Sequence, residues 1–181
     1  DLYIFTPPGY RRHGARTYPV LYLQDGQNVF SREGTWPVRW DADGTAARLI
    51  RRRRIEELII VGIANSEWRD DEYTPTEDAL EGAGGLADLY LRHLVEEVKP
   101  FIDGNFRVRP FREDTAIGGS SLGGLLALYA AMTYPHYFSK VAALSPSLWV
   151  APEALTALVG RCKLAPGTVL YMDYGSREMG N

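Results

Sequence analysis

The chain has 181 residues, 45% of them hydrophobic and 24% charged, and its formal net charge is −3 at pH 7. This length suits one domain with a sizeable core and is too short for two domains of ordinary size. The slightly acidic balance argues against a nucleic-acid partner, and the single cysteine excludes an internal disulfide framework and a cysteine-rich metal site.

Neither a membrane anchor nor a secretion signal is evident in the sequence. No apolar run approaches the roughly 18 residues of a membrane span, and the N-terminus lacks the layout of a signal peptide. We therefore expect a cytoplasmic protein with no membrane partner. The chain starts at Asp1 without an initiator methionine, so we expect that an upstream segment is missing.

The expected elements alternate between strands and helices. Several of the strands are continuous apolar runs, as is typical of strands buried on both faces of a parallel sheet. The pattern predicts an α/β fold with a mainly parallel sheet, helices on both faces and an antiparallel opening strand pair. Expected strands cover Leu2–Thr6, Tyr18–Leu23, Glu57–Ile63, Asp114–Gly118, Lys140–Leu144 and Thr168–Met172, and expected helices cover Ala46–Arg54, Leu86–Ile102, Gly124–Met132 and Pro152–Leu158.

Polar loops follow several of these strands. In an open α/β sheet the carboxyl ends of the strands meet at one edge, where ligands bind. We therefore expect one functional rim, formed by the turn around Ser121 and by the loops Asp25–Asn28, Asn65–Tyr73, Ser145–Trp149 and Asp173–Glu178.

The turn Gly119–Gly123 reads Gly-Ser-Ser-Leu-Gly and lies between an expected strand and an expected helix. A G-x-S-x-G turn in this context is typical of a nucleophile elbow, in which small residues flank a serine on a strained backbone. Centring on Ser121 places glycines at both required positions, whereas centring on Ser120 would place Leu122 at the second one. Ser121 is therefore the candidate nucleophile and Ser120 a spacer, and a purely structural turn is the alternative.

Four consecutive arginines, Arg51–Arg54, end the first expected helix. Cations at a helix C-terminus offset the helix dipole, so we interpret this run as a solvated helix end. An anion or nucleic-acid patch is the alternative interpretation.

Several short sequence segments along the chain match one known family. They are Pro7–Tyr10, Tyr18–Asn28, Glu72–Pro75, Lys99–Asp103, Gly119–Gly124 and Ser145–Trp149. In this order they resemble the putative-esterase family of α/β-hydrolases, which includes enterochelin esterases, the esterase D group, feruloyl esterases and mycolyltransferases. The resemblance covers nearly the whole chain. It implies an α/β-hydrolase fold and a serine carboxylic-ester hydrolase that acts on a small-molecule ester without a metal or an organic cofactor.

The resemblance also assigns roles to individual residues. Ser121 would form an acyl-enzyme, and the backbone N–H groups of Gln27 and Leu122 would form the oxyanion hole. Glu178 lies where the family's acid usually falls, with Asp173 as the alternative. The candidate substrate-pocket residues are Trp36, Trp40, Arg69, Tyr73 and Trp149, and for the tryptophans core or loop packing is the alternative.

The triad histidine is missing. In this fold the triad runs serine, acid, histidine, but after Glu178 only Met179, Gly180 and Asn181 remain. The chain's histidines stand elsewhere, and we interpret each as a surface or helix-end residue rather than a displaced base: His13, His93 and His136.

Two interpretations follow from the missing histidine. In the first, residues 1–181 are a single α/β-hydrolase domain that is incomplete and lacks the C-terminal histidine segment. In the second, the protein is a noncatalytic hydrolase-like binding module. We expect the first, because the chain stops directly after a strand and its loop. Acyl transfer to an alcohol, as in the mycolyltransferase branch, is the alternative within the same chemistry.

Overall fold

A central sheet organises the computed structural model, which describes residues 1–12, 14–30, 39–78, 82–150, 152–162 and 164–176. The sheet has six strands in the order β1-β3-β2-β6-β7-β8. All neighbours are parallel except β1, which runs antiparallel to β3. The predicted mainly parallel α/β fold is therefore confirmed. The strands are β1 (Leu2–Phe5), β2 (Val20–Leu23), β3 (Ile59–Ile63), β6 (Thr115–Ser120), β7 (Lys140–Leu144) and β8 (Val169–Asp173).

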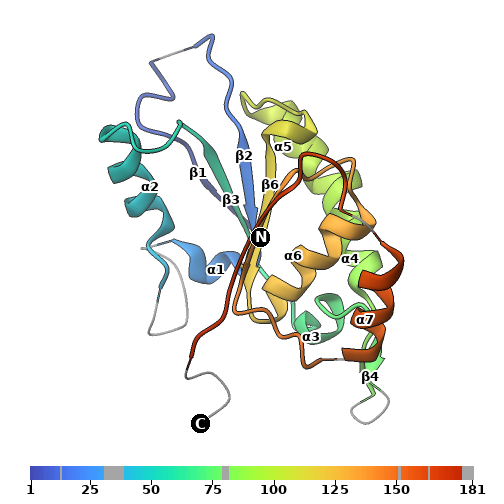
Figure 1. Cartoon of the computed structure of the whole chain (residues 1–181). Helices are drawn as coiled ribbons and strands as arrows, with labels where there is room; N and C mark the ends of the chain where they lie inside the picture. The colour runs from blue at the N-terminus through green and yellow to red at the C-terminus, as the bar shows by residue number, and fades with distance from the viewer. Residues whose placement is uncertain (13, 31–38, 79–81, 151, 163, 177–181) are drawn as a thin grey trace.

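Alternation along the central strands sorts their side chains into two cores. On β2, Val20 and Tyr22 belong to the larger cluster, whereas Leu23 belongs to the smaller one. Successive side chains of a strand point to opposite faces, so each face needs its own cover. Helices α4 (Ala87–His93), α5 (Lys99–Asn105) and α6 (Leu122–Thr133) cover the first face, and α1 (Gly26–Val29) and α2 (Ala42–Arg51) cover the second (Figure 1).

The helices follow the prediction with shifted bounds. They are α2 (Ala42–Arg51), α4 (Ala87–His93), α5 (Lys99–Asn105), α6 (Leu122–Thr133) and α7 (Pro152–Arg161). A π-helical turn, Leu94–Val98, joins α4 to α5 within the expected helix Leu86–Ile102. Pro100 has no N–H and its ring crowds the carbonyl four residues before it, so a local widening of the helix at this point has a clear cause.

Four short elements were not predicted. Helices α1 (Gly26–Val29) and α3 (Arg69–Glu72) stand where the sequence indicated polar loops, and β4 (Glu77–Asp78) pairs with β5 (Ala83–Gly84). These elements are too short to show a hydrophobic period, which is the signal on which sequence interpretation depends. No helix in the described part of the chain combines the length and the apolar character needed to cross a bilayer.

The arginine run forms the exposed end of α2. Arg53 has φ 54°, its N–H donates to the Ile50 carbonyl, and the Arg54 N–H donates to the Leu49 carbonyl. This paired arrangement is a Schellman motif, which satisfies the last carbonyls of a helix. The interpretation as a solvated helix end therefore agrees with the structure.

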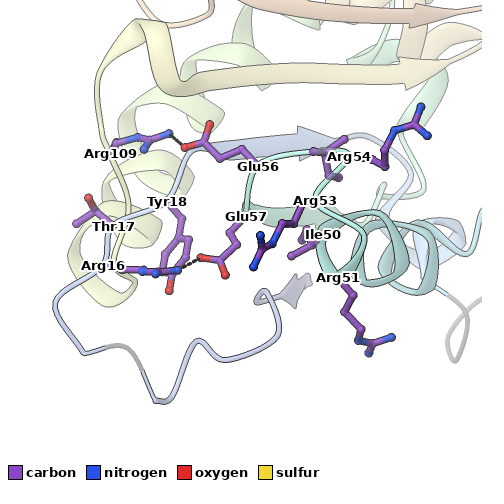
Figure 2. A pocket seen from close by; sticks show the side chains of 11 residues that line it. Arg16, Thr17, Tyr18, Ile50, Arg51, Arg53, Arg54, Glu56, Glu57 and Arg109 are labelled. Atoms are coloured by element: carbon purple, nitrogen blue, oxygen red, sulfur yellow. Dashed lines mark hydrogen bonds and ion pairs between the residues drawn. The ribbon is translucent and has the colours of Figure 1, made fainter.

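A hollow of about 830 Å³ lies beside this helix end, at the amino-terminal ends of the parallel strands. Arg16 pairs with Glu57 and Arg109 with Glu56, each at 2.7 Å (Figure 2). The side chain of Arg51 points away from these pairs (Figure 2). The guanidinium groups around this hollow thus do not converge on one point, as a built anion site would require.

Candidate active site

Ser121 occupies the turn between β6 and α6 with φ 56° and ψ −124°. A positive φ is costly for a residue with a side chain and persists only where the surroundings enforce it. Here the Ser121 N–H donates to the Leu144 carbonyl at 3.1 Å, and the Ser121 carbonyl accepts the N–H groups of Gly124 and Leu125. The neighbouring strand and the first turn of α6 together hold the serine in this conformation.

The glycines of the turn are required by close packing. A Cβ on Gly119 would lie 2.6 Å from the carbonyl carbon of Gly123, and one on Gly123 would lie 3.0 Å from the Gln24 Cβ. The helix can therefore start directly over the strand only if both positions lack a side chain. This packing explains the G-x-S-x-G spacing in physical terms.

Ser147 is the hydroxyl partner of Ser121. Their Oγ atoms are 3.0 Å apart, and the Ser147 N–H donates to the Ser121 carbonyl at 3.1 Å. Ser147 is 1% exposed, and it comes from the loop after β7. The loop that the sequence placed on the functional rim thus fixes the rotamer of the candidate nucleophile.

Replacing Ser147 with alanine is expected to lower kcat/KM for an ester about 3- to 10-fold, since one net hydrogen bond contributes about 1 kcal/mol. Steady-state kinetics should show this loss, while Ser139→Ala, a buried serine outside the hollow, should behave as the wild type. An unchanged rate for Ser147→Ala would contradict the positioning role.

A polar hollow of about 460 Å³ opens beside Ser121. Its lining comes from the carboxyl ends of β2, β3 and β6, three strands that neighbour one another in the sheet. The predicted convergence of loops on one rim is thereby confirmed for these three. The lining residues are Asp25, Asn28, Trp40, Asn65, Arg69, Ser120 and Ser121.

Asp25 lies at the centre of a charged network in this hollow. Its carboxylate accepts Arg69 Nε at 2.6 Å, Arg69 Nη2 at 2.9 Å and Asn65 Nδ2 at 2.7 Å. The hydrogen bonds that Arg69 donates to the Asp25 carboxylate raise the pKa of the Arg69 guanidinium, which therefore stays charged. Three donors thus bind the two oxygens of Asp25, and the network ties the loop after β2 to the loop after β3.

Tyr73 supports the same residue from the core. Its hydroxyl accepts the Asp25 N–H at 3.3 Å, and its ring lies 5.1 Å below the Arg69 guanidinium. Burial raises the pKa of Tyr73 above the usual range, as it does for the neighbouring Tyr90. Both tyrosines therefore stay neutral at physiological pH.

Comparison with known proteins decides the family. The family model described as "Putative esterase" matches residues 1–177. The chain belongs to this family. Its curated relatives include YbbA of Bacillus subtilis, which is 30% identical over 97% of this chain and 67% of that protein. A siderophore triacetylfusarinine C esterase of Aspergillus fumigatus is 32% identical over 77% of this chain and 47% of that protein.

Solved structures agree with this esterase assignment. Siderophore hydrolase EstA from Aspergillus nidulans has a TM-score of 0.72 at 28% identity and covers 98% of this chain and 64% of that one. An IroE-like serine hydrolase from Shewanella oneidensis has a TM-score of 0.70 at 30% identity, covering 88% of this chain and 50% of that one. The expected α/β-hydrolase fold is thus confirmed. The chain spans about half to two thirds of the length of these relatives.

The structure places the esterase residues expected from sequence as follows. Gln27 lies in α1 and Leu122 is the first residue of α6. Trp40 and Arg69 line the hollow, whereas Tyr73 is 0% exposed and Trp149 is 49% exposed and lies outside the lining. Trp36 and Glu178 lie outside the described residues, so their assignments stay predictions.

Asp173, the alternative acid, terminates β8. Its Oδ1 accepts the Ser145 N–H at 3.0 Å, and its Oδ2 accepts the Tyr171 hydroxyl at 3.0 Å. These bonds are what a carboxylate that satisfies loop amides would make, as the sequence reasoning allowed for this residue. The side chain does not line the Ser121 hollow.

Neither histidine in the described part of the chain lines that hollow. His93 Nδ1 lies 3.3 Å from Glu97 Oε1 on the surface of the helix that covers the first face. His136 is exposed in the turn after α6. Both positions agree with the interpretation as surface residues, and His13 lies outside the described residues.

Sequence reasoning missed the roles of Asp25, Asn65 and Ser147. Each lies in a loop that was placed on the rim, so their location was available from the pattern. The pairing of Asp25 with Arg69, 44 positions apart, could not be predicted. No local periodicity links an acid after one strand to a base after the next strand. One signal was available: Asp25 and Arg69 carry opposite charges in loops that follow successive strands and were expected to meet at one edge of the sheet.

Proposed function

We propose that this chain carries the nucleophile of a serine carboxylic-ester hydrolase. The strained backbone of Ser121, with its hydroxyl at the polar hollow, is the observation that carries the proposal. A serine presented in this way can attack an ester carbonyl and form an acyl-enzyme, which water then hydrolyses. Family membership and relatives that are esterases support the same reaction class.

The charge that develops on the carbonyl oxygen requires preorganised donors. We assign this role to the backbone N–H groups of Gln27 and Leu122, one from each element that flanks the hollow. Both belong to helices that begin at strand ends and pack closely against the sheet, so little reorganisation is needed as the charge forms. A general base must also take the proton of Ser121, and we propose a histidine, as the order of the family's triad predicts.

The substrate is proposed to be a small, polar ester. The lining of the hollow mixes amide, carboxylate and guanidinium groups with one described aromatic side chain, that of Trp40. Relatives named for hydrolysis of siderophore esters support a substrate of that chemical kind. Acylated sugars and aryl esters are competing substrates of similar size.

Hydrolysis in ¹⁸O-labelled water tests the reaction. The protein in its full natural length is incubated with p-nitrophenyl butyrate, with and without methanol. We expect release of p-nitrophenol and one ¹⁸O atom in the butyrate product. Exclusive formation of methyl butyrate would instead indicate an acyltransferase, and a rate equal to that of buffer would indicate a noncatalytic binding module.

A further inference from the structure

We infer that Arg69 is a positioning residue that fixes the Gln27 amide by holding Asp25. This inference rests on the proposed function, since it assumes that Gln27 donates to the oxyanion. It differs from the substrate-binding role that the sequence suggested for Arg69.

The turn that carries Gln27 does not hold its shape through local preference alone. Asp25, directly before Gly26, has φ 56° and ψ 46°, a left-handed conformation that residues with a Cβ rarely adopt. Such a residue persists only where neighbouring groups determine its conformation. The position of the Gly26 and Gln27 N–H groups therefore depends on the contacts that hold Asp25.

Three residues from the segment after β3 hold Asp25 in place through hydrogen bonds. Arg69 binds both carboxylate oxygens, at 2.6 and 2.9 Å, and Asn65 Nδ2 binds one of them. Tyr73, on the same short segment as Arg69, accepts the Asp25 N–H. The Asn65 N–H also donates to Gln27 Oε1 at 3.3 Å. Residues of α3 and of the segments directly before and after it thus hold both the side chain and the backbone of Asp25, and the side chain of Gln27.

The geometry of the guanidinium favours this role over contact with substrate. Arg69 Nε and Nη2 are committed to Asp25, and Nη1 lies 3.4 Å from Asp70 Oδ1. The Arg69 and Asp25 side chains are 27% and 13% exposed, so the pair is shielded from much of the solvent. A bidentate, half-buried pair is more rigid than a single surface contact.

The Asp25 carboxylate also lies between the two elements that carry the proposed oxyanion amides, those of Gln27 and Leu122. A Cβ built on Gly123 would lie 3.4 Å from Asp25 Oδ2, so the carboxylate packs against the first turn of α6. That turn carries the Leu122 N–H. Removal of Arg69 takes away two of the three hydrogen bonds to the Asp25 carboxylate and leaves that of Asn65. Asp25 can then shift relative to both elements, which disturbs the common geometry of the two amides.

The test compares Arg69→Lys and Arg69→Ala with Arg92→Ala, an exposed arginine of α4, in the full natural protein. We expect Arg69→Ala to lower kcat for p-nitrophenyl butyrate about 10- to 100-fold, below the cost of deleting an oxyanion donor outright, with KM changed less than about threefold. Arg69→Lys keeps the charge but loses the bidentate fork, and should lose about 5- to 10-fold in kcat. Arg92→Ala should match the wild type.

Two further readouts separate positioning from general damage. Added methylguanidine should restore part of the kcat of Arg69→Ala, and Asp25→Ala combined with Arg69→Ala should be about as slow as either single variant. A raised KM with unchanged kcat, or wild-type kcat in Arg69→Lys, would overturn the inference. Absence of turnover in the wild type would instead contradict the proposed function itself.

Discussion

Replacing Ser121 with alanine is expected to lower kcat/KM for p-nitrophenyl butyrate by about 10⁴- to 10⁶-fold, as loss of a serine nucleophile does in other hydrolases. The substitution removes a hydroxyl that contacts Ser147 and leaves the rest of the hollow in place. Stopped-flow and steady-state assays on the full natural protein check this result. Ser120→Ala, which alters the spacer of the turn, should keep turnover within about tenfold of the wild type because it removes no reacting atom.

Ser121→Gly offers an independent control on the strained backbone. It should be as inactive as Ser121→Ala, yet resist unfolding by about 1 kcal/mol more, because glycine adopts a positive φ without a steric cost. Chemical denaturation of the two variants measures this difference. Equal stability would show that the backbone at this position, φ 56°, stores no strain.

Replacing Gly26 with alanine is expected to destabilise the fold by about 3 kcal/mol, the upper range for overpacking a rigid site. The added Cβ would lie 2.4 Å from the Gly62 carbonyl carbon and 2.6 Å from the Ile63 nitrogen, both backbone atoms of β3. The turn that carries Gln27 would have to lift away from the sheet. Thermal unfolding should therefore occur roughly 10 °C lower, and esterase activity should fall even in the folded fraction.

Gly104→Ala is the matched control for this substitution. Gly104 lies in α5, and a Cβ there would meet no atom within 4 Å. Alanine should stabilise this helix by up to about 1 kcal/mol. If Gly26→Ala unfolded at the same temperature as Gly104→Ala, the close approach between α1 and β3 would not be a constraint on the turn.

The sheet and the elbow were predictable because they depend on local signals. Apolar runs such as Glu57–Ile63 are typical of strands buried on both faces, and parallel strands end at one edge of the sheet. Glycines around Ser121 indicated a tight strand-to-helix turn, and the structure shows the contacts that require them. The fold class and the place of Ser121 in a strand-to-helix turn therefore follow from the sequence, whereas its role as nucleophile stays a proposal.

The supporting parts of the site were not predictable in the same way. The ion pair between Asp25 and Arg69 depends on the exact register of β2 against β3, in which Leu23 faces Gly62. Residue patterns do not encode that register. Tyr73 was a candidate pocket residue, but its ring packs in the core and its hydroxyl accepts the Asp25 N–H. An aromatic residue with a polar tip satisfies both environments.

Mapping a covalent adduct tests the central claim most directly. The full natural protein is treated with a fluorophosphonate ester, digested and analysed by tandem mass spectrometry. One adduct on the Ser121 hydroxyl is the predicted result, and it should disappear in Ser121→Ala but persist in Ser120→Ala. An active esterase whose adduct maps to Ser120, or to any serine outside the turn between β6 and α6, would contradict the account.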